Sequence, residues 1–174
     1  MGANRRLTAL DLLQSRTRDW PGAVSPVMRL MAMLYRLSDL ALANAKAAMT
    51  AHGLRLSEFD VLAALRGAPP PHELTPTDLY GALLISSGGL TKVLASLQRR
   101  KLASRPAADD DRRSRPVRLT AGGRALAERT MADVARVDGE FVARGLAPAE
   151  VRRLAALLEK QLAAIEQSHD SGER

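Results

Sequence analysis

The sequence contains no cysteine and very few aromatic residues. Without thiols, the chain can form no disulfide, no thiol redox sensor and no cysteine-ligated metal site. Its two phenylalanines, two tyrosines and one tryptophan, with sparse valine and isoleucine, leave little material for β-sheet. Alanine, leucine and arginine are abundant instead and favour helix. We therefore predict a mostly helical protein.

Long apolar runs and targeting signals are also missing. No apolar stretch approaches the ~20 residues that span a bilayer. The N-terminal Met-Gly-Ala-Asn-Arg-Arg-Leu lacks the apolar segment of a secretory signal. We therefore expect a cytoplasmic protein without a membrane partner. Its 174 residues are enough for one domain with extensions and a buried core.

Catalytic motifs are absent as well. The sequence has no Gly-x-Ser-x-Gly, no His-Glu-x-x-His and no phosphate-binding loop with Gly-Lys-Ser/Thr. The three histidines, His52, His72 and His169, fall at a predicted helix end, in a loop and in the tail. We expect neither an enzyme nor a cofactor or metal site.

Positive charge is concentrated in one segment. Residues 99 to 118 hold eight basic and three acidic residues, a net +5 of the chain's +7. A charge spread evenly over a protein favours solubility, whereas a charge packed into one segment indicates a polyanionic partner such as nucleic acid.

Residues 74–119 carry this charge on a predicted helix-turn-helix and hairpin. Thr75-Pro76-Thr77-Asp78 is a typical helix start, and Ser86 is placed to cap a second helix that runs to Arg100. The second helix has an apolar stripe at Leu90, Val93, Leu94 and Leu97. Its other face carries Ser87, Thr91, Lys92, Ser96 and Arg99 and no acid, which suits base edges and phosphates.

The hairpin that follows is predicted to be a two-stranded β-wing. Residues 102–106 and 116–119 form its strands, and residues 109–115 form a charged tip.

Long helices are predicted on both sides of this core. Ser25 and Pro26 begin a helix that Gly53 ends, about 26 residues or roughly 40 Å long, which suggests a partner chain. Ser57 is expected to cap the next helix, and residues 67–73 to form a loop. Thr120 and Pro148 begin the last two helices. We predict an extra N-terminal helix and linker in 1–24, a dimerisation helix in 25–56, a winged helix-turn-helix core in 57–119, C-terminal dimerisation helices in 120–168 and a tail in 169–174.

Several segments resemble the MarR family of bacterial winged-helix regulators. The resemblance covers about residues 27–168 and is carried by residues 75–79, 85–92, 97–102, 110–114 and 117–120. It implies a homodimer that acts as a repressor, as is usual in this family, on a pseudo-palindromic duplex. The second helix would enter the major groove and the wing the adjacent minor groove. The DNA-binding residues are then Ser86, Ser87, Thr91, Lys92, Ser96, Arg99, Asp111, Arg112, Arg113 and Arg115.

A finer resemblance concerns members that respond to urate and related ligands. Trp20, Asp60 and Arg105 stand at matching places, whereas Val93 stands where those members carry an arginine. Asp60 beside an apolar face needs a cation, and we hypothesise that Arg105 is this partner. A small aromatic or purine-like anion near Trp20 would compete for the arginine and release the wing. Tyr35 is a further candidate for this pocket.

Other readings remain open. The Asp60–Arg105 pair could serve only to tie a helix to the wing. The basic hairpin could belong to an architectural protein that binds nucleic acid without sequence preference, and a ligand-binding dimer that has lost its DNA function is a third alternative. A regulator would prefer one palindromic site by ~10³-fold or more over random DNA, whereas an architectural protein would not.

Overall fold

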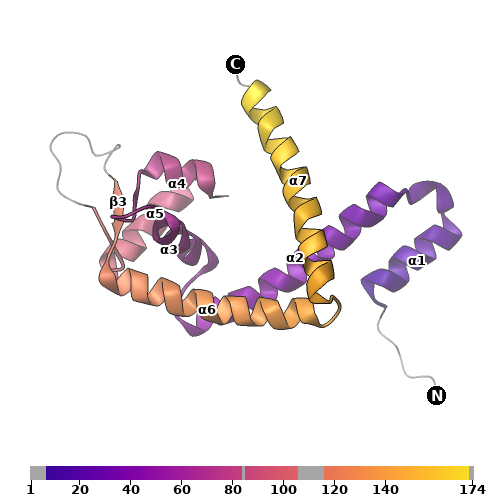
Figure 1. The fold of residues 1–174 in the computed structure, drawn as a ribbon, viewed down its shortest axis with the longest axis horizontal. Coiled ribbons are helices and arrows are strands. Elements are labelled where there is room, and N and C mark those ends of the chain that lie inside the picture. The colour runs from indigo at the N-terminus through magenta and orange to yellow at the C-terminus, as the bar shows by residue number, and fades with distance from the viewer. Residues whose placement is uncertain (1–6, 84, 106–115, 173–174) are drawn as a thin grey trace. The chain divides into compact units, whose positions relative to one another are not determined.

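The computed structural model describes residues 7–83, 85–105 and 116–172, with side chains up to residue 167 (Figure 1). The fold is mostly helical with one small sheet, as predicted. It divides into two compact units, Met1–Ala47 and Ala48–Arg174. Each unit is described by itself.

The first unit consists of α1 (Ala9–Asp19), a short 3-10 helix η1 (Pro21–Ala23) and most of α2 (Pro26–Ala51). A reciprocal cap begins α1, because the Thr8 hydroxyl accepts from the Asp11 amide at 3.1 Å and the Asp11 carboxylate accepts from the Thr8 amide at 2.8 Å. Leu13 is the buried side chain of α1. The side chain of Trp20, which follows α1, is 68% exposed.

Both ends of α2 lie where the sequence predicts them. The Ser25 hydroxyl accepts from the Met28 amide at 3.2 Å, and Pro26 is the first helical residue. Gly53 has φ 67°, and its amide donates to the Thr50 carbonyl at 2.9 Å. Glycine adopts this left-handed conformation without strain, and so it ends the helix.

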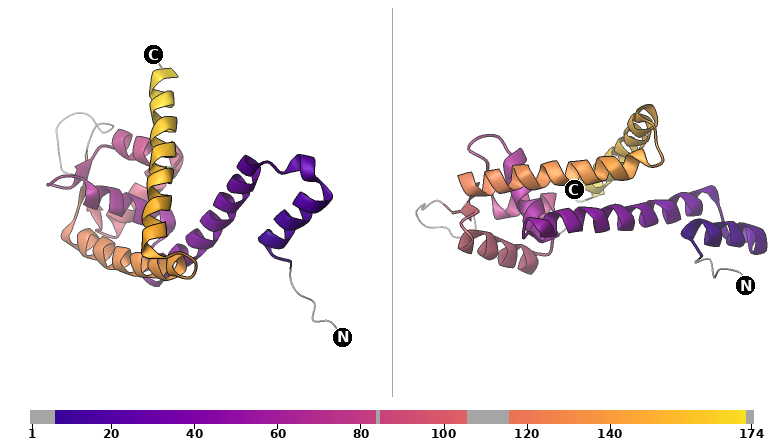
Figure 2. Two further views of the ribbon diagram at one scale, coloured as in Figure 1. Left: turned by 45° about the vertical axis from the view of Figure 1, so that its right-hand side comes forward. Right: turned by 90° about the horizontal axis from the view of Figure 1, so that it is seen from below.

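The second unit contains the other helices and the sheet. The helices are α3 (Leu56–Gly67), α4 (Pro76–Ala82), α5 (Ser87–Arg99), α6 (Ala121–Ala143) and α7 (Pro148–Gly172). Its fully buried side chains are Val61, Leu62, Leu65, Leu79, Leu97, Val117 and Thr130. α3 packs against α5, α6 and β3, while α6 runs from the base of the wing along α3 and leads into α7 (Figure 2).

The sheet has three antiparallel strands in the order β1-β3-β2, one more than predicted. They are β1 (Glu73–Leu74), β2 (Ala103–Ser104) and β3 (Val117–Leu119). Glu73 pairs with Arg118 in the register of β1 and β3, and Ala103 pairs with Leu119 in that of β2 and β3. β1 begins at the end of the segment that we expect to be a loop. The sequence does not predict this strand, because two residues after a proline run show no alternation of polar and apolar side chains.

The start of α3 also differs from the prediction. The helix begins at Leu56, with Arg55 as the N-cap residue instead of Ser57. The Glu58 carboxylate accepts from the Arg55 amide at 3.0 Å. The glutamate at the third helical position therefore satisfies the backbone amide of the N-cap residue, which is the half of a capping box that needs no serine.

The base of the wing is joined tightly to the first turn of α6. The Thr120 hydroxyl caps this helix by accepting from the Gly123 amide at 3.0 Å. It also lies 2.9 Å from the Lys101 carbonyl oxygen, to which it can donate. A Cβ on Gly123 would lie 1.9 Å from the backbone oxygen of Leu102, closer than any real contact. Only glycine fits at this position.

Most apolar side chains of α7 are exposed in the single chain. They are Leu154, Leu157, Leu158, Leu162 and Ile165. Within the described ranges, no single helix is long and apolar enough to cross a membrane. α4 and α5 pass that test only as a pair bent by 119°, and only by length and composition.

We predict that Gly123→Ala lowers the free energy of unfolding by about 1–3 kcal/mol, because the new methyl group forces the α6 backbone away from Leu102. Chemical denaturation measures the change. Gly139→Ala in the same helix is the matched control, since no atom lies within 4 Å of its added Cβ. It should raise stability by about 0.5–1 kcal/mol. Equal effects of the two substitutions would contradict the close approach at Gly123.

Candidate nucleic-acid interface

Two capped helices and a short connection form the helix-turn-helix. The Thr75 hydroxyl accepts from the Asp78 amide at 3.1 Å, and the Asp78 carboxylate accepts from the Thr75 amide at 3.0 Å, so that α4 begins with the predicted capping box. The Ser86 hydroxyl accepts from the Gly89 amide at 3.2 Å and caps α5, also as predicted. The local sequence thus fixes where both helices begin.

The predicted apolar stripe anchors α5 in the core. Leu90, Val93, Leu94 and Leu97 are all buried. Val93 is only 5% exposed, so the position where the urate-responsive pattern has an arginine points into the core in this chain. A cation there would be buried, which is costly unless it is paired.

The opposite face of α5 is open and basic. Ser87, Thr91, Lys92 and Arg99 are exposed, and the Thr91 hydroxyl donates to the Ser87 carbonyl at 3.1 Å. Among the residues that the structure describes, neither Lys92 nor Arg99 forms an ion pair. We call this set the outer face of α5. It offers hydroxyls and unpaired cations of the kinds that contact base edges and phosphates.

Ser96 does not belong to this face, contrary to the prediction. Its side chain is 8% exposed, and its hydroxyl donates to Glu58 Oε1 at 2.7 Å. The residue lies at the boundary between the apolar stripe and the outer face. Helical spacing alone could not decide on which side of that boundary it falls.

The partner of Ser96 is a buried acid that the sequence reading missed. Glu58 is 3% exposed and has Arg55 Nη2 at 3.3 Å and Arg100 Nη1 at 3.4 Å. Burial alone would raise the pKa of this carboxyl, but hydrogen bonds from the Arg55 amide, the Ser96 hydroxyl and the Arg55 side chain outweigh it. The resulting pKa is lowered to about 2. Glu58 is therefore an anion at neutral pH, with partners on both α3 and α5.

The base of the wing carries two further exposed arginines. Arg118 on β3 forms an ion pair with Glu73 on β1, across the registered strand pair. Arg105 follows β2 and is also exposed. The predicted tip residues Asp111, Arg112, Arg113 and Arg115 lie outside the described residues.

The four predicted ligand residues fall in different units. Trp20 and Tyr35 belong to the first unit, where Tyr35 borders a cleft of about 270 Å³ between α1 and α2 that also contains Arg16. Asp60 and Arg105 belong to the second unit and form no ion pair with each other, so the hypothesised Asp60–Arg105 pair is wrong for this structure. Desolvation raises the pKa of Asp60, as expected for a half-buried carboxyl without a cation.

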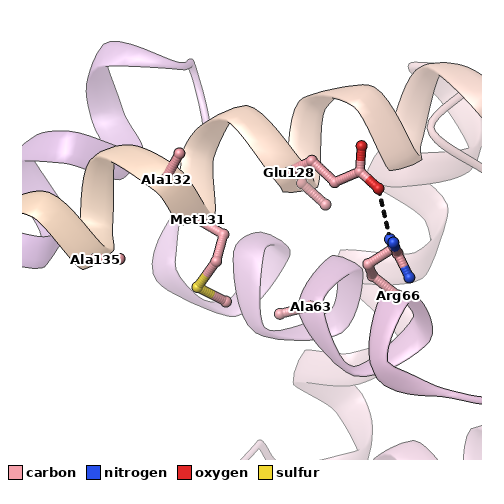
Figure 3. Close-up of a pocket in the computed structure, with 7 residues that line it drawn as sticks. Ala63, Arg66, Glu128, Met131, Ala132 and Ala135 are labelled. Carbon is pink, nitrogen blue, oxygen red and sulfur yellow. Dashed lines mark hydrogen bonds and ion pairs between the residues drawn. The ribbon is translucent and has the colours of Figure 1, made fainter.

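A groove of about 400 Å³ lies between α3 and α6 (Figure 3). Its floor is apolar, with Ala63 on α3 and Met131 on α6, and an ion pair between Arg66 Nε and Glu128 Oε1 at 2.7 Å lies at one end. The other lining residues are Ala127, Ala132 and Ala135. Asp60 lies two turns before Gly67 on α3, one turn before Ala63. The groove combines a flat apolar surface with one accessible guanidinium.

Comparison with known proteins shows to which family the chain belongs. A sequence model of the MarR family matches residues 52–114. The HTH-type transcriptional repressor Rv2887 of Mycobacterium tuberculosis is 34% identical over 128 residues, which cover 74% of this chain and 89% of the relative. The chain belongs to the MarR family. It is a transcriptional regulator and not an enzyme, and the resemblance seen in the sequence is confirmed.

Solved structures agree with this assignment to the MarR family. Rv2887 in complex with salicylic acid superposes with a TM-score of 0.63 at 33% identity, covering 79% of this chain and 97% of the other. Bordetella bronchiseptica BpsR, whose DNA binding is regulated by 6-hydroxynicotinic acid, superposes with a TM-score of 0.67 at 28% identity, covering 76% and 98%. The regulator PecS of Dickeya dadantii is 30% identical over 73% of this chain and 76% of its own.

We predict that Glu58→Gln lowers the free energy of unfolding at pH 7 by on the order of 3 kcal/mol, since the folded-state pKa of about 2 lies well below the ordinary value of 4.5. A lowered pKa stabilises the fold above pH 4.5, and this stabilisation is lost as the pH falls towards 2. The difference between the two proteins in urea denaturation should therefore shrink across that window.

Glu128→Gln is the matched control for this measurement. Its carboxylate pairs with Arg66 at the surface, with about half of the side chain exposed, so the loss should stay below ~1 kcal/mol. A pH-independent difference between Glu58→Gln and the parent would show that the charge of Glu58 is not what stabilises the fold.

Proposed function

We propose that this regulator is a ligand-responsive repressor that binds a pseudo-palindromic DNA operator as a homodimer. The observation that carries the proposal is the outer face of α5, a capped helix that presents hydroxyls and unpaired cations and no acid. Such a face suits a negatively charged groove in which base edges can be read. A protein with this role acts in the cytoplasm, where bacterial DNA lies.

In this arrangement α5 enters the major groove. Thr91 and Lys92 reach base edges, Ser86, Ser87 and Arg99 contact the sugar–phosphate backbone, and the wing follows the neighbouring minor groove. Arg112 and Arg113 at the wing tip would use the negative potential of that groove, with Asp111 and Arg115 beside them. Two copies of α5 would then meet half-sites about one helical turn, ~34–36 Å, apart.

The exposed stripe of α7 supports dimer formation. Five large apolar side chains recur along one helix, from Leu154 to Ile165, and stay open in the single chain. A contiguous apolar surface of this kind is typical of a protein–protein interface. Two copies could cover it mutually and thereby present two α5 helices to one duplex.

The groove between α3 and α6 supports a small aromatic acid as the ligand. Its volume lies within the ~300–1,000 Å³ range of ligand pockets, and its alanine and methionine floor suits a flat ring. Arg66 would exchange Glu128 for the ligand's carboxylate. Salicylic acid and 6-hydroxynicotinic acid, named for Rv2887 and BpsR, share this chemistry. Of the predicted ligand residues, Asp60 lies on the same helix as this groove, one turn before Ala63. Trp20, Tyr35 and Arg105 remain ligand candidates from the sequence alone.

We predict that Lys92→Gln weakens binding to a duplex selected by the parent protein from a random 30-bp pool. Loss of one contact to bases or phosphates should cost about tenfold or more in Kd. Fluorescence anisotropy at fixed salt measures this. Arg144→Gln, at the far end of α6, is the control and should leave Kd unchanged. Failure of the selection to enrich any palindrome would favour the architectural alternative instead.

We predict that salicylate and 6-hydroxynicotinate raise the thermal midpoint of the parent protein and lower its affinity for the selected duplex. Arg66→Gln should abolish both effects, because it removes the cation of the groove. Glu128→Gln should strengthen them, because it frees Arg66 from its intramolecular partner. If ligand effects persist unchanged in Arg66→Gln, the ligand binds elsewhere.

A further inference from the structure

A buried carboxylate links α3 directly to the helix that carries the outer face. Glu58 Oε1 accepts from the Ser96 hydroxyl at 2.7 Å. Oε2 accepts from the Arg55 amide at 3.0 Å and lies 3.4 Å from Arg100 Nη1. Ser96 lies on α5 and Arg100 is the C-cap residue that directly follows it, so that a single anion contacts the last turn of the helix and its end, four residues apart.

The residues that Glu58 contacts lie beside the outer face of α5. At about 100° per residue, Arg99 lies within ~20° of Lys92 around the helix axis, while Ser96 and Arg100 lie ~40° and ~80° away. The two tethered residues therefore flank the outer face, between it and the buried Val93. Any rotation of α5 about its axis would break the bonds to Glu58.

The remaining contacts of α5 cannot fix that rotation as sharply. The apolar stripe supplies most of the stabilisation, but apolar contacts are non-directional. A hydrogen bond to a charged group is directional, and the bond from the Ser96 hydroxyl to Glu58, at 2.7 Å, is also short and strong. The Arg100 contact, at 3.4 Å, adds a weaker second restraint. Readout of bases requires side chains to be held within about 0.5 Å and 10–20°, whereas phosphate contacts tolerate small displacements.

We propose that Glu58 is a positioning residue for sequence readout, which sets the rotation of α5 through Ser96 and Arg100 and holds Arg100 away from DNA phosphates. The inference rests on the proposed function as a DNA-binding regulator. It separates the cations of this region into two roles. Arg99 neutralises phosphate, while Arg100, whose side chain is 35% exposed, is a counter-charge to Glu58 that helps to aim the helix.

The test compares Glu58→Gln, Ser96→Ala, Arg100→Gln and the double variant Glu58→Gln/Ser96→Ala with the parent. Each is titrated with the duplex that the parent selects from a random 30-bp pool and with the unselected pool, over a series of salt concentrations and well below its thermal midpoint. We expect each single variant to lower the ratio of the two affinities about tenfold. The double variant should lose no more than the worse single variant, because both changes break the same link.

Arg99→Gln provides the matched comparison for Arg100→Gln. Removing a phosphate-neutralising cation should reduce the slope of log affinity against log salt by about 0.9 on both duplexes. Arg100→Gln should leave that slope unchanged and reduce only the affinity ratio. Substitution of Arg99 would then change the salt slope, whereas substitution of the adjacent Arg100 would change only the affinity ratio. A general loss of stability cannot produce this difference.

Several outcomes would overturn the inference. If Glu58→Gln and Ser96→Ala lower the thermal midpoint but leave the affinity ratio of the folded protein intact, the link is purely structural. If Arg100→Gln reduces the salt slope as Arg99→Gln does, Arg100 contacts phosphate. If Glu58→Gln fails to fold, the affinity ratio of Ser96→Ala tests the inference instead, since this variant loses only one hydroxyl. An unchanged ratio in Ser96→Ala would then refute the inference. A parent protein that prefers no duplex would instead refute the proposed function itself.

Discussion

The second unit depends on the burial of α3 between its neighbours. Val61, Leu62 and Leu65 are fully buried where α3 packs against α5, α6 and β3. Each such side chain stabilises the fold by about 1.5–3 kcal/mol relative to an exposed one. Because α3 supplies the common contact surface, α5, β3 and the long helix α6 share a single core, and displacing one of them would cost buried contacts with α3.

Charge in this unit is sorted between the inside and the outside. Three described acids of the second unit are engaged within the fold: Glu58 is buried against Ser96, Glu73 pairs with Arg118 and Glu128 pairs with Arg66. Lys92 and Arg99, in contrast, face outward on α5. Engaging the acids leaves the outer surface with a positive potential that attracts a polyanion over a distance. Of the chain's net charge of +7, residues 99–118 carry +5.

Local sequence signals predicted much of this architecture. The sequence predicts the capping residues Thr75, Ser86 and Thr120 correctly, because a helix start depends on residues only three or four positions apart. The apolar stripe of α5 was found for the same reason. These features need no knowledge of the rest of the fold.

Features that depend on distant partners were missed. β1 exists only because β3 pairs with it. The buried Glu58 depends in part on a hydroxyl from Ser96, 38 residues further along. Ser96 was assigned to the wrong side of α5 because it lies at the boundary of the stripe. The expected pairing of Asp60 with Arg105 rested on the need of a half-buried carboxyl for a cation, but Asp60 tolerates its position with a raised pKa instead.

The close approach of Gly123 to Leu102 has a genetic consequence. Every missense change in a glycine codon introduces a side-chain carbon, and at this position that carbon would collide with a main-chain oxygen that cannot rotate away. Every amino-acid replacement at position 123 should therefore destabilise the fold. A Cβ added at Gly88 or Gly139, in contrast, would have no atom within 4 Å. In a saturation library, position 123 should stand out as an intolerant site although it lies on α6, outside the outer face of α5.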